Sequence, residues 1–139
     1  MNPLIYHNPD CGTSRNVLAV IEAAGYQPVV VEYLKAGWTD ALLRTLLTGA
    51  GLTPRQALRE TKSPARDLGL LEEGTRDEAI FAAMLEAPVL VNRPFVVTPR
   101  GIRLCRPSET VLDLLDRWPP GPFLKEDGRP MIDAQGRRV

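Results

Sequence analysis

The residues best suited to chemistry in this sequence lie around one of its two cysteines, Cys11. An apolar run, Leu4-Ile5-Tyr6, precedes this cysteine and predicts a strand, and an amphipathic segment that begins near Arg15 predicts a helix. Cys11 is therefore expected in a strand-to-helix turn, where free backbone N–H groups carry partial positive charge. A thiolate in such a turn is stabilised, and so is an anion brought to it.

The four residues after Cys11 would assist the same chemistry. Gly12 lets the backbone approach an anion closely. Thr13 and Ser14 offer a helix cap and hydroxyl donors, and Arg15 adds a permanent positive charge. The interpretation is an activated cysteine in an anion-binding turn. The alternative is a buried, inert cysteine beside an ordinary helix cap.

The second cysteine, Cys105, lies on a predicted strand and is expected to be structural, because a free cysteine behaves as a small hydrophobic residue. Two cysteines and one histidine make neither a disulfide framework nor a metal-ligand set, so we expect no metal site. The motif from Cys11 to Ser14 is CxxS and lacks a second cysteine that would resolve a bond to Cys11. An external thiol must therefore release this nucleophile.

The composition excludes several classes of partner. The 17 basic and 17 acidic residues cancel, so no overall field would draw the protein to nucleic acid or to a membrane, and any anion site must be local. The sequence has no basic segment followed by an apolar run at its N-terminus, and no stretch approaches the length of a membrane span. A cytoplasmic location is expected.

Hydrophobic spacing predicts the elements that position these residues. A strand at 4–6, a helix from about Ser14 to Ala24 and a strand at 29–33 make a parallel βαβ unit. The second strand is a nearly unbroken apolar run, which indicates a strand covered on both faces. Residues approximately 38–88 are expected to be a helical insertion, in which capping boxes at Thr53 and Thr75 each start a helix.

The remainder of the chain predicts two more strands and a final helix. Strands at 95–98 and 102–105 with a short loop between them indicate an antiparallel hairpin. Pro107-Ser108 is expected to cap a helix at about 109–115. The tail, approximately 119–139, is rich in proline, glycine and charge, and is expected to be extended and loose, or pinned along the surface.

This order of elements is that of an α/β, thioredoxin-like fold: a mixed four-stranded sheet flanked by helices, in a single domain over residues 1–139. In that fold a proline in the cis form commonly precedes the third strand and faces the cysteine. Pro94 stands at that place in the order and is predicted to be cis, although trans is the ordinary state of an X–Pro bond.

Four arginines could bind an oxyanion, because a guanidinium presents a rigid fork of donors that suits oxyanions. Arg15 is in the cysteine turn, Arg93 precedes Pro94, Arg106 follows the last strand, and Arg59 lies in the insertion. The alternative for each is a solvated surface charge, which fits Arg93 and Arg106 least because each abuts a proline at a strand end. The single histidine, His7, is either a hydrogen-bonded structural group or a partly charged group that helps to ionise Cys11.

Taken together, these segments resemble the glutaredoxin-coupled arsenate reductases over nearly the whole chain. The similarity is carried by the active-site loop at 7–16, by Asn92-Arg93-Pro94-Phe95 with the strand that follows, by Leu104 to Glu109, by an arginine in Leu58-Arg59-Glu60, and by the tail segment Lys125 to Gly128. One departure is Asp10, whose negative charge stands where a small residue would be expected and opposes ionisation of the neighbouring thiol.

The resemblance implies an enzyme that reduces arsenate, and so a role in arsenic detoxification. It implies Cys11 as the nucleophile, with Arg59, Arg93 and Arg106 as oxyanion ligands. The expected site also contains His7 and Ser14 beside the nucleophile, and Gly12, Thr13 and Arg15 on the substrate. Glutathione is implied as co-substrate and glutaredoxin as protein partner, with no bound cofactor.

Two other functions are weighed against this one. A non-catalytic regulator of the same fold would bind RNA polymerase and use a CxxC redox switch, but Ser14 stands where that switch needs a cysteine. The phosphatase-like arsenate reductases need a cysteine and an arginine around a five-residue phosphate loop. Only three residues separate Cys11 from Arg15, which excludes that class.

Overall fold

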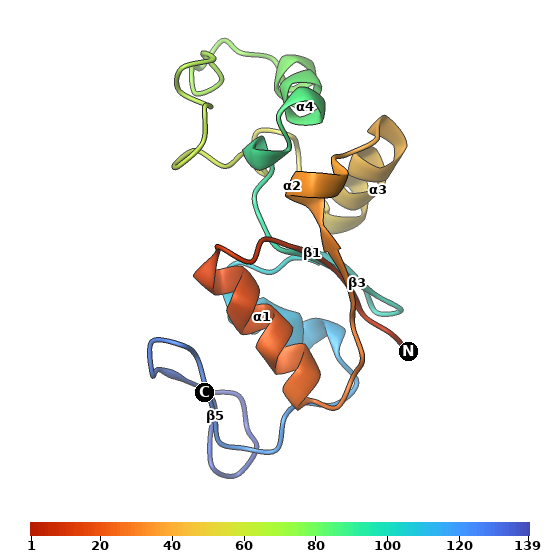
Figure 1. The fold of residues 1–139 in the computed structure, drawn as a ribbon, viewed down its shortest axis with the longest axis vertical. Helices are drawn as coiled ribbons and strands as arrows, with labels where there is room; N and C mark the ends of the chain where they lie inside the picture. Colours follow the sequence, from red (N-terminus) through yellow and green to blue (C-terminus); the bar gives the residue numbers. More distant parts are fainter. The chain divides into compact units, whose positions relative to one another are not determined.

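The structure is a computed structural model that describes residues 1–139. Contacts between its residues divide the chain into two compact units. The first unit combines residues 1–32 with 93–139, and the second comprises residues 33–92. Each unit is described by itself below, and Figure 1 shows the path of the chain through both.

A mixed four-stranded sheet forms the centre of the first unit, in the strand order β2-β1-β3-β4. β1 pairs in parallel with β2 and antiparallel with β3, and β3 pairs antiparallel with β4. The predicted βαβ unit, hairpin and thioredoxin-like sheet are therefore confirmed. The bounds of the strands are β1 Leu4–His7, β2 Val29–Glu32, β3 Phe95–Thr98 and β4 Gly101–Leu104.

Helix α1 connects β1 to β2 and covers residues Gly12–Ala23, so that it begins before the predicted start at Ser14. Val17, Val20 and Ile21 on this helix are fully buried in a core cluster that also contains residues of β1, β3 and the C-terminal segment. Gly25 follows the helix with a φ of +92°, the left-handed conformation that glycine adopts without penalty.

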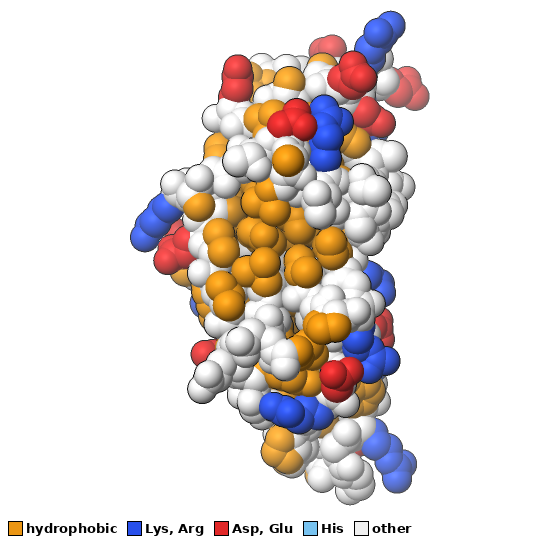
Figure 2. All heavy atoms as spheres, turned by 90° about the vertical axis from the view of Figure 1, so that its right-hand side faces the viewer, with side chains coloured by type: hydrophobic (Ala, Val, Ile, Leu, Met, Phe, Trp, Pro, Cys, Tyr) orange, Lys and Arg blue, Asp and Glu red, His pale blue; other side chains and the backbone are white.

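The prediction that the strand at 29–33 is covered on both faces was wrong. β2 is an edge strand of the sheet, and Val29 and Val30 are 51% and 43% exposed. An apolar run indicates a strand, but it does not show whether the strand lies at the centre or at an edge. Hydrophobic side chains gather at the surface of the face seen in Figure 2.

After β4, residues Ser108–Leu114 form the 3₁₀ helix η2 rather than the predicted helix at 109–115. Ser108 makes no capping bond to the backbone, so this part of the prediction was also wrong. Val111, Leu112 and Leu114 are buried in the same core cluster as α1. The apolar residues were correctly placed inside, but the tighter helical geometry was not predictable from their spacing.

The tail is ordered and is not loose. β5 Phe123–Leu124 and β6 Pro130–Ile132 form an antiparallel hairpin, seen in blue in Figure 1. Met131 and Ile132 are fully buried in the core cluster. The many proline, glycine and charged residues predicted a segment that is loose or pinned along the surface. The tail is fixed more firmly than either alternative, because two of its apolar side chains complete the core.

The second unit contains helices α2 Tyr33–Ala36, α3 Asp40–Ala50 and α4 Asp77–Glu86, with the 3₁₀ helix η1 Pro88–Leu90. Thr39 caps α3 by accepting the N–H of Leu42, and Gly51 ends it with a φ of +70°. None of the helices in the chain combines the length and the hydropathy that a membrane span requires.

The two predicted capping boxes have different outcomes. Thr53 and Gln56 exchange the expected bonds, but the segment that follows forms turns instead of a helix. Thr75 donates its hydroxyl to the carbonyl of Gly69 and leaves Arg76 at the N-cap of α4 without a side-chain bond. The helix was predicted correctly and its cap was wrong.

The burial of Ile132 predicts that the C-terminal hairpin contributes to stability. Replacing Ile132 by alanine should lower the free energy of unfolding by about 2–5 kcal/mol, because it leaves a cavity in the core. Urea denaturation measures the change. Leu124→Ala on the same hairpin is the matched control, since Leu124 is 57% exposed. Equal effects of the two substitutions would contradict the packing of β6 in the core.

Candidate active site

Cys11 occupies the N-cap position of α1, directly after the turn that follows β1. Its backbone N–H donates to the carbonyl of Asn8 at 3.1 Å, and its carbonyl accepts the N–H of Arg15 at 2.9 Å. The side chain of Cys11 makes no capping bond to the helix. The turn therefore fixes the backbone and leaves the sulfur beside the unpaired N–H groups of the first helical turn.

Donors from separate segments surround the sulfur. Nη1 of Arg106 lies 3.7 Å from Sγ and also donates to the carbonyl of Arg93 at 3.1 Å. Burial alone raises the pKa of Cys11, but the N–H of Ser14, the charge of Arg93 and the guanidinium of Arg106 lower it further than burial raises it. The net pKa is below the ordinary value for a thiol, as predicted.

Strand pairing explains why the two arginines meet Cys11. Arg93 shortly precedes β3 and Arg106 shortly follows β4, and Phe95 pairs with Leu104 in that hairpin. Both arginines therefore lie at the same end of the hairpin. β1 runs antiparallel to β3 and ends at this same edge, so the turn with Cys11 emerges there.

The peptide bonds before both prolines at this edge are cis. Arg93–Pro94 is cis, as the sequence predicted, and Arg106–Pro107 is cis as well. The second was missed, because the sequence around Pro107 was read only as a helix start. In the structure, the carbonyl of Pro94 accepts the N–H of Cys105 at 2.9 Å and continues the pairing of the two strands.

His7 is a structural partner of Ser14. Nδ1 of His7 lies 2.6 Å from Oγ of Ser14, and the same oxygen accepts the N–H of Asn8 at 3.1 Å. Burial lowers the pKa of His7, and the charge of Glu32 opposes this only in part. The lowered pKa favours the neutral imidazole and the structural role of His7 over the charged helper considered for Cys11. His7 orders the turn through Ser14.

Arg15 is paired with a carboxylate that the sequence reading did not select. Its Nε and Nη2 donate to Glu126 at 2.7 and 3.1 Å, and its Nη1 donates to the carbonyl of Pro9 at 2.8 Å. The N–H of Glu126 in turn donates to Asn16 at 3.0 Å. The charge of Arg15 is largely compensated by Glu126, so it is a weaker candidate for binding an anion than Arg93 or Arg106.

Cys105 and Arg59 complete the set of candidate residues. Cys105 is fully buried in the core cluster, and burial raises its pKa to about 12, which fits the predicted structural role. Arg59 belongs to the second unit and is buried, with its Nε donating to the carbonyl of Thr61 at 3.0 Å and its N–H donating to Leu90 at 2.8 Å. Its role as an oxyanion ligand stays a prediction.

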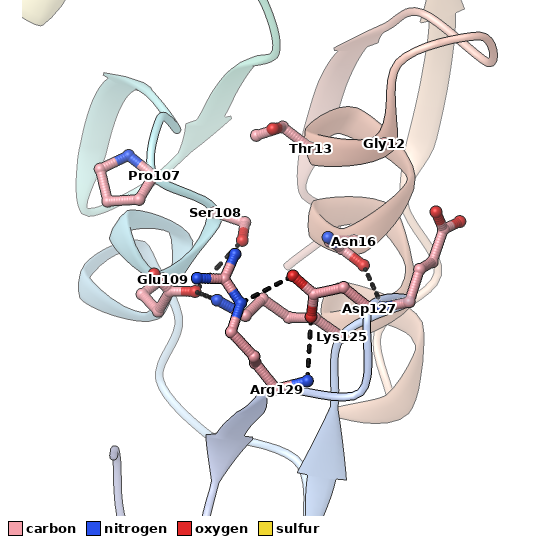
Figure 3. Close-up of a pocket in the computed structure, with 10 residues that line it drawn as sticks. Gly12, Thr13, Asn16, Pro107, Ser108, Glu109, Lys125, Asp127 and Arg129 are labelled. Atoms are coloured by element: carbon pink, nitrogen blue, oxygen red, sulfur yellow. Dashed lines mark hydrogen bonds and ion pairs between the residues drawn. The ribbon is translucent and has the colours of Figure 1, made fainter.

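Gly12 and Thr13 line a pocket of about 320 Å³ that adjoins the cysteine turn (Figure 3). In the upper part of Figure 3, Thr13 on α1 faces Pro107 and Ser108 across the pocket. The C-terminal hairpin closes another side, which only the tertiary structure reveals. The lining comes from Gly12, Thr13 and Asn16 of α1, from residues 107–109, and from residues 125–127 and Arg129 of the hairpin turn.

The geometry around Sγ predicts how Cys11 reacts as the pH changes. A lowered pKa keeps the thiolate present at pH values where an ordinary cysteine is protonated, so alkylation by iodoacetamide should persist below neutral pH. Arg106→Gln should shift the rate–pH profile to higher pH and slow alkylation at pH 6 roughly threefold to tenfold. Arg103→Gln, an exposed arginine on β4, is the control. An unchanged profile for Arg106→Gln would contradict the assigned contact.

Comparison with known proteins identifies the family. The model of the ArsC family matches residues 6–114. The chain is 66% identical to arsenate reductase ArsI2 of Synechocystis sp. over 136 residues, which cover 98% of this chain and 97% of that protein. It is 45% identical to an arsenate reductase of Escherichia coli (strain K12) over 138 residues, with 99% and 98% covered.

Comparison of the fold with solved structures also identifies arsenate reductases. The solved structure of an arsenate reductase from Vibrio cholerae superposes with a TM-score of 0.77 at 39% identity, and the match covers 83% of this chain and 98% of that one. The resemblance to arsenate reductases drawn from the sequence is therefore confirmed, together with the thioredoxin-like fold. The chain belongs to the ArsC family.

Proposed function

We propose that this protein is an arsenate reductase and that Cys11 is its nucleophile. The observation that carries the proposal is the guanidinium of Arg106 at 3.7 Å from Sγ of Cys11, with Arg93 close enough to lower the pKa of the thiol. A thiolate beside two fixed cations suits attack on a tetrahedral oxyanion, since the cations both stabilise the sulfur and bind the substrate. Relatives at 45–66% identity over nearly the whole chain carry the name arsenate reductase.

In the first step, the thiolate of Cys11 attacks the arsenic of arsenate. A sulfur–arsenic bond forms, and one oxygen leaves as water after it is protonated. Arg93 and Arg106 neutralise the charge on the remaining oxygens and hold the oxyanion against the sulfur. Arg59 is the third expected ligand, on the family resemblance alone. Gly12, Thr13 and Arg15 are proposed to assist substrate binding from the first turn of α1.

In the second step, glutathione supplies the electrons. Its thiolate attacks the sulfur of Cys11, a disulfide bond forms, and the sulfur–arsenic bond breaks. The electron pair of that bond stays on arsenic, which passes from the five-valent to the three-valent state and leaves as arsenite. Glutaredoxin then attacks the mixed disulfide and returns Cys11 to the thiolate. Cys105 is buried and cannot attack the mixed disulfide, which supports the need for an external thiol.

The other residues of the turn have supporting roles in this proposal. Ser14 donates its N–H to the sulfur, and its side chain is fully buried between His7 and the N–H of Asn8. His7 and Ser14 thus position the nucleophile without exchanging protons with the substrate. A regulator that binds RNA polymerase has no observation in its favour, because Ser14 cannot form the disulfide of a CxxC switch.

Replacing Cys11 tests the proposal directly. Cys11→Ser should abolish arsenite production in an assay that contains arsenate, glutathione and glutaredoxin, because a serine hydroxyl is not ionised at neutral pH. Cys105→Ala is the matched control and should stay active. With the parent protein, omission of glutaredoxin should leave Cys11 joined to glutathione, which mass spectrometry detects. Turnover by Cys11→Ser would refute the nucleophile, and turnover without either thiol partner would refute the coupling.

The two arginines are tested by conservative substitution. Arg93→Lys and Arg106→Lys should each lower kcat/KM for arsenate roughly tenfold or more, because a lysine keeps the charge but loses the paired donors of a guanidinium. Arg100→Lys, at an exposed arginine paired with Asp116, is the control. If both variants turned over like the parent, the assignment of the oxyanion ligands would be wrong.

A further inference from the structure

The contact between Cys11 and Arg106 joins two segments that are far apart in the sequence. Cys11 stands at the start of α1, and Arg106 lies between β4 and η2. Nη1 of Arg106 is 3.7 Å from Sγ of Cys11. The attraction between a cation and a thiolate falls as their separation grows. Whatever fixes the spacing of the two segments therefore sets how strongly Arg106 acts on the sulfur.

Near the sulfur, the two segments are separated by the pocket of Figure 3. Gly12, Thr13 and Asn16 of α1 form one wall, and residues 107–109 form another. Close packing of side chains fixes the spacing of segments in a protein core. It does not do so across a pocket. The hairpin turn, residues 125–129, lines the pocket as well and contacts both segments.

Lys125 links the hairpin turn to the segment that carries Arg106. Its Nζ lies 2.8 Å from Oε1 of Glu109, three residues after Arg106, and a dashed line in Figure 3 marks this pair. The two side chains are only 13% and 22% exposed, so water screens the pair weakly. Burial raises the pKa of Glu109, and the bond from Lys125 lowers it by more.

Glu126 links the same turn to the segment that carries Cys11. Its two carboxylate oxygens accept Nε and Nη2 of Arg15 at 2.7 and 3.1 Å, and its N–H donates to Asn16 at 3.0 Å. Nη1 of Arg15 donates to the carbonyl of Pro9, two residues before Cys11, at 2.8 Å. An exposed ion pair contributes little to stability. A bidentate pair nevertheless fixes the direction of the guanidinium, and so of its bond to the cysteine turn.

The hairpin turn has its own anchor in the core. Met131 and Ile132 of β6 are fully buried there. The N–H of Lys125 donates to the carbonyl of Arg129 at 2.9 Å and closes the turn above that strand. Lys125 and Glu126 are thus neighbours on a fixed support, and each holds a different wall of the pocket.

We propose that Lys125 and Glu126 are positioning residues that hold the segment of Cys11 and the segment of Arg106 at the spacing seen between Sγ and Nη1. The two links act in series, so the loss of either one releases the spacing. The inference rests on the proposed function and deepens it, because the same spacing places the guanidinium of Arg106 beside the arsenic that the sulfur attacks.

Alkylation of Cys11 by iodoacetamide tests the proposal without arsenate. Glu126→Ala should slow alkylation at about pH 6 roughly twofold to fivefold, because Arg106 moves away and the pKa of the thiol rises. At alkaline pH, where the thiol is ionised in both proteins, the rates should converge. Charge alone predicts the opposite sign, since removal of a nearby carboxylate favours the thiolate.

Three further variants separate a link from a charge. Glu126→Gln removes the same charge as Glu126→Ala but keeps an acceptor for Arg15, so it should slow alkylation less. Lys125→Met should slow alkylation as Glu126→Ala does, and the double variant should be no slower than the slower single variant, because the links are in series. Asp127→Asn is the matched control, since Asp127 pairs with Arg129 within the turn. It should not slow alkylation.

Mass spectrometry gives the rate and also locates the alkylated cysteine. Modification of the buried Cys105 reports a variant that has lost its fold. If only one of Glu126→Ala and Lys125→Met unfolds, the other decides. If both unfold, the turn holds the whole fold and the proposal is wrong.

The proposal would also be overturned by unchanged or faster alkylation of Glu126→Ala, by equal slowing in Glu126→Gln or in Asp127→Asn, or by additive slowing in the double variant. In the arsenate assay, Glu126→Ala and Lys125→Met should lower kcat/KM by factors similar to those for alkylation. If the parent protein produces no arsenite, the proposed function fails, and the alkylation rates still decide whether the two residues set the spacing.

Discussion

The lowered pKa of the Cys11 thiol is the feature on which the functional part of this structure depends. The sulfur is buried, and burial alone favours the neutral thiol. The N–H of Ser14 and the cations Arg93 and Arg106 reverse that preference. These groups come from a helix and from the two strands of a β-hairpin, so the lowering of the thiol pKa depends on the folded protein. The sheet serves to bring the three segments to one edge.

The elements around this edge were predictable because their signals are local. Hydrophobic spacing predicted β1, α1, β3 and β4, and the short loop between β3 and β4 predicted their antiparallel pairing. From that order followed the place of Arg93 and Arg106 beside Cys11, although they are far from it in the sequence. The exposure of β2 was not predictable in the same way. An apolar run such as the one that contains Val29 and Val30 occurs in central strands and in edge strands alike.

The partners of Arg15 and His7 could not be predicted from the sequence alone. Arg15 looked like an anion ligand since it follows the cysteine closely, but Glu126 pairs with it from 111 residues away. No local sequence pattern predicts such a pair. His7 looked like a possible charged helper, and its burial lowers its pKa while Nδ1 lies beside the hydroxyl of Ser14. In both cases the type of residue suggested a role, and its surroundings, set by tertiary packing, decided it.

The C-terminal hairpin carries a consequence for how members of this family are compared. The match to the family model ends at residue 114 of this chain, and the hairpin begins after that point. Yet Met131 and Ile132 complete the core, and residues 125–127 enclose the cavity beside the nucleophile. A protein that matches the model in full but lacks this segment would keep the cysteine and the arginines and lose a wall of the cavity. Such a protein would keep the residues around the sulfur and lose the surroundings of Gly12 and Thr13.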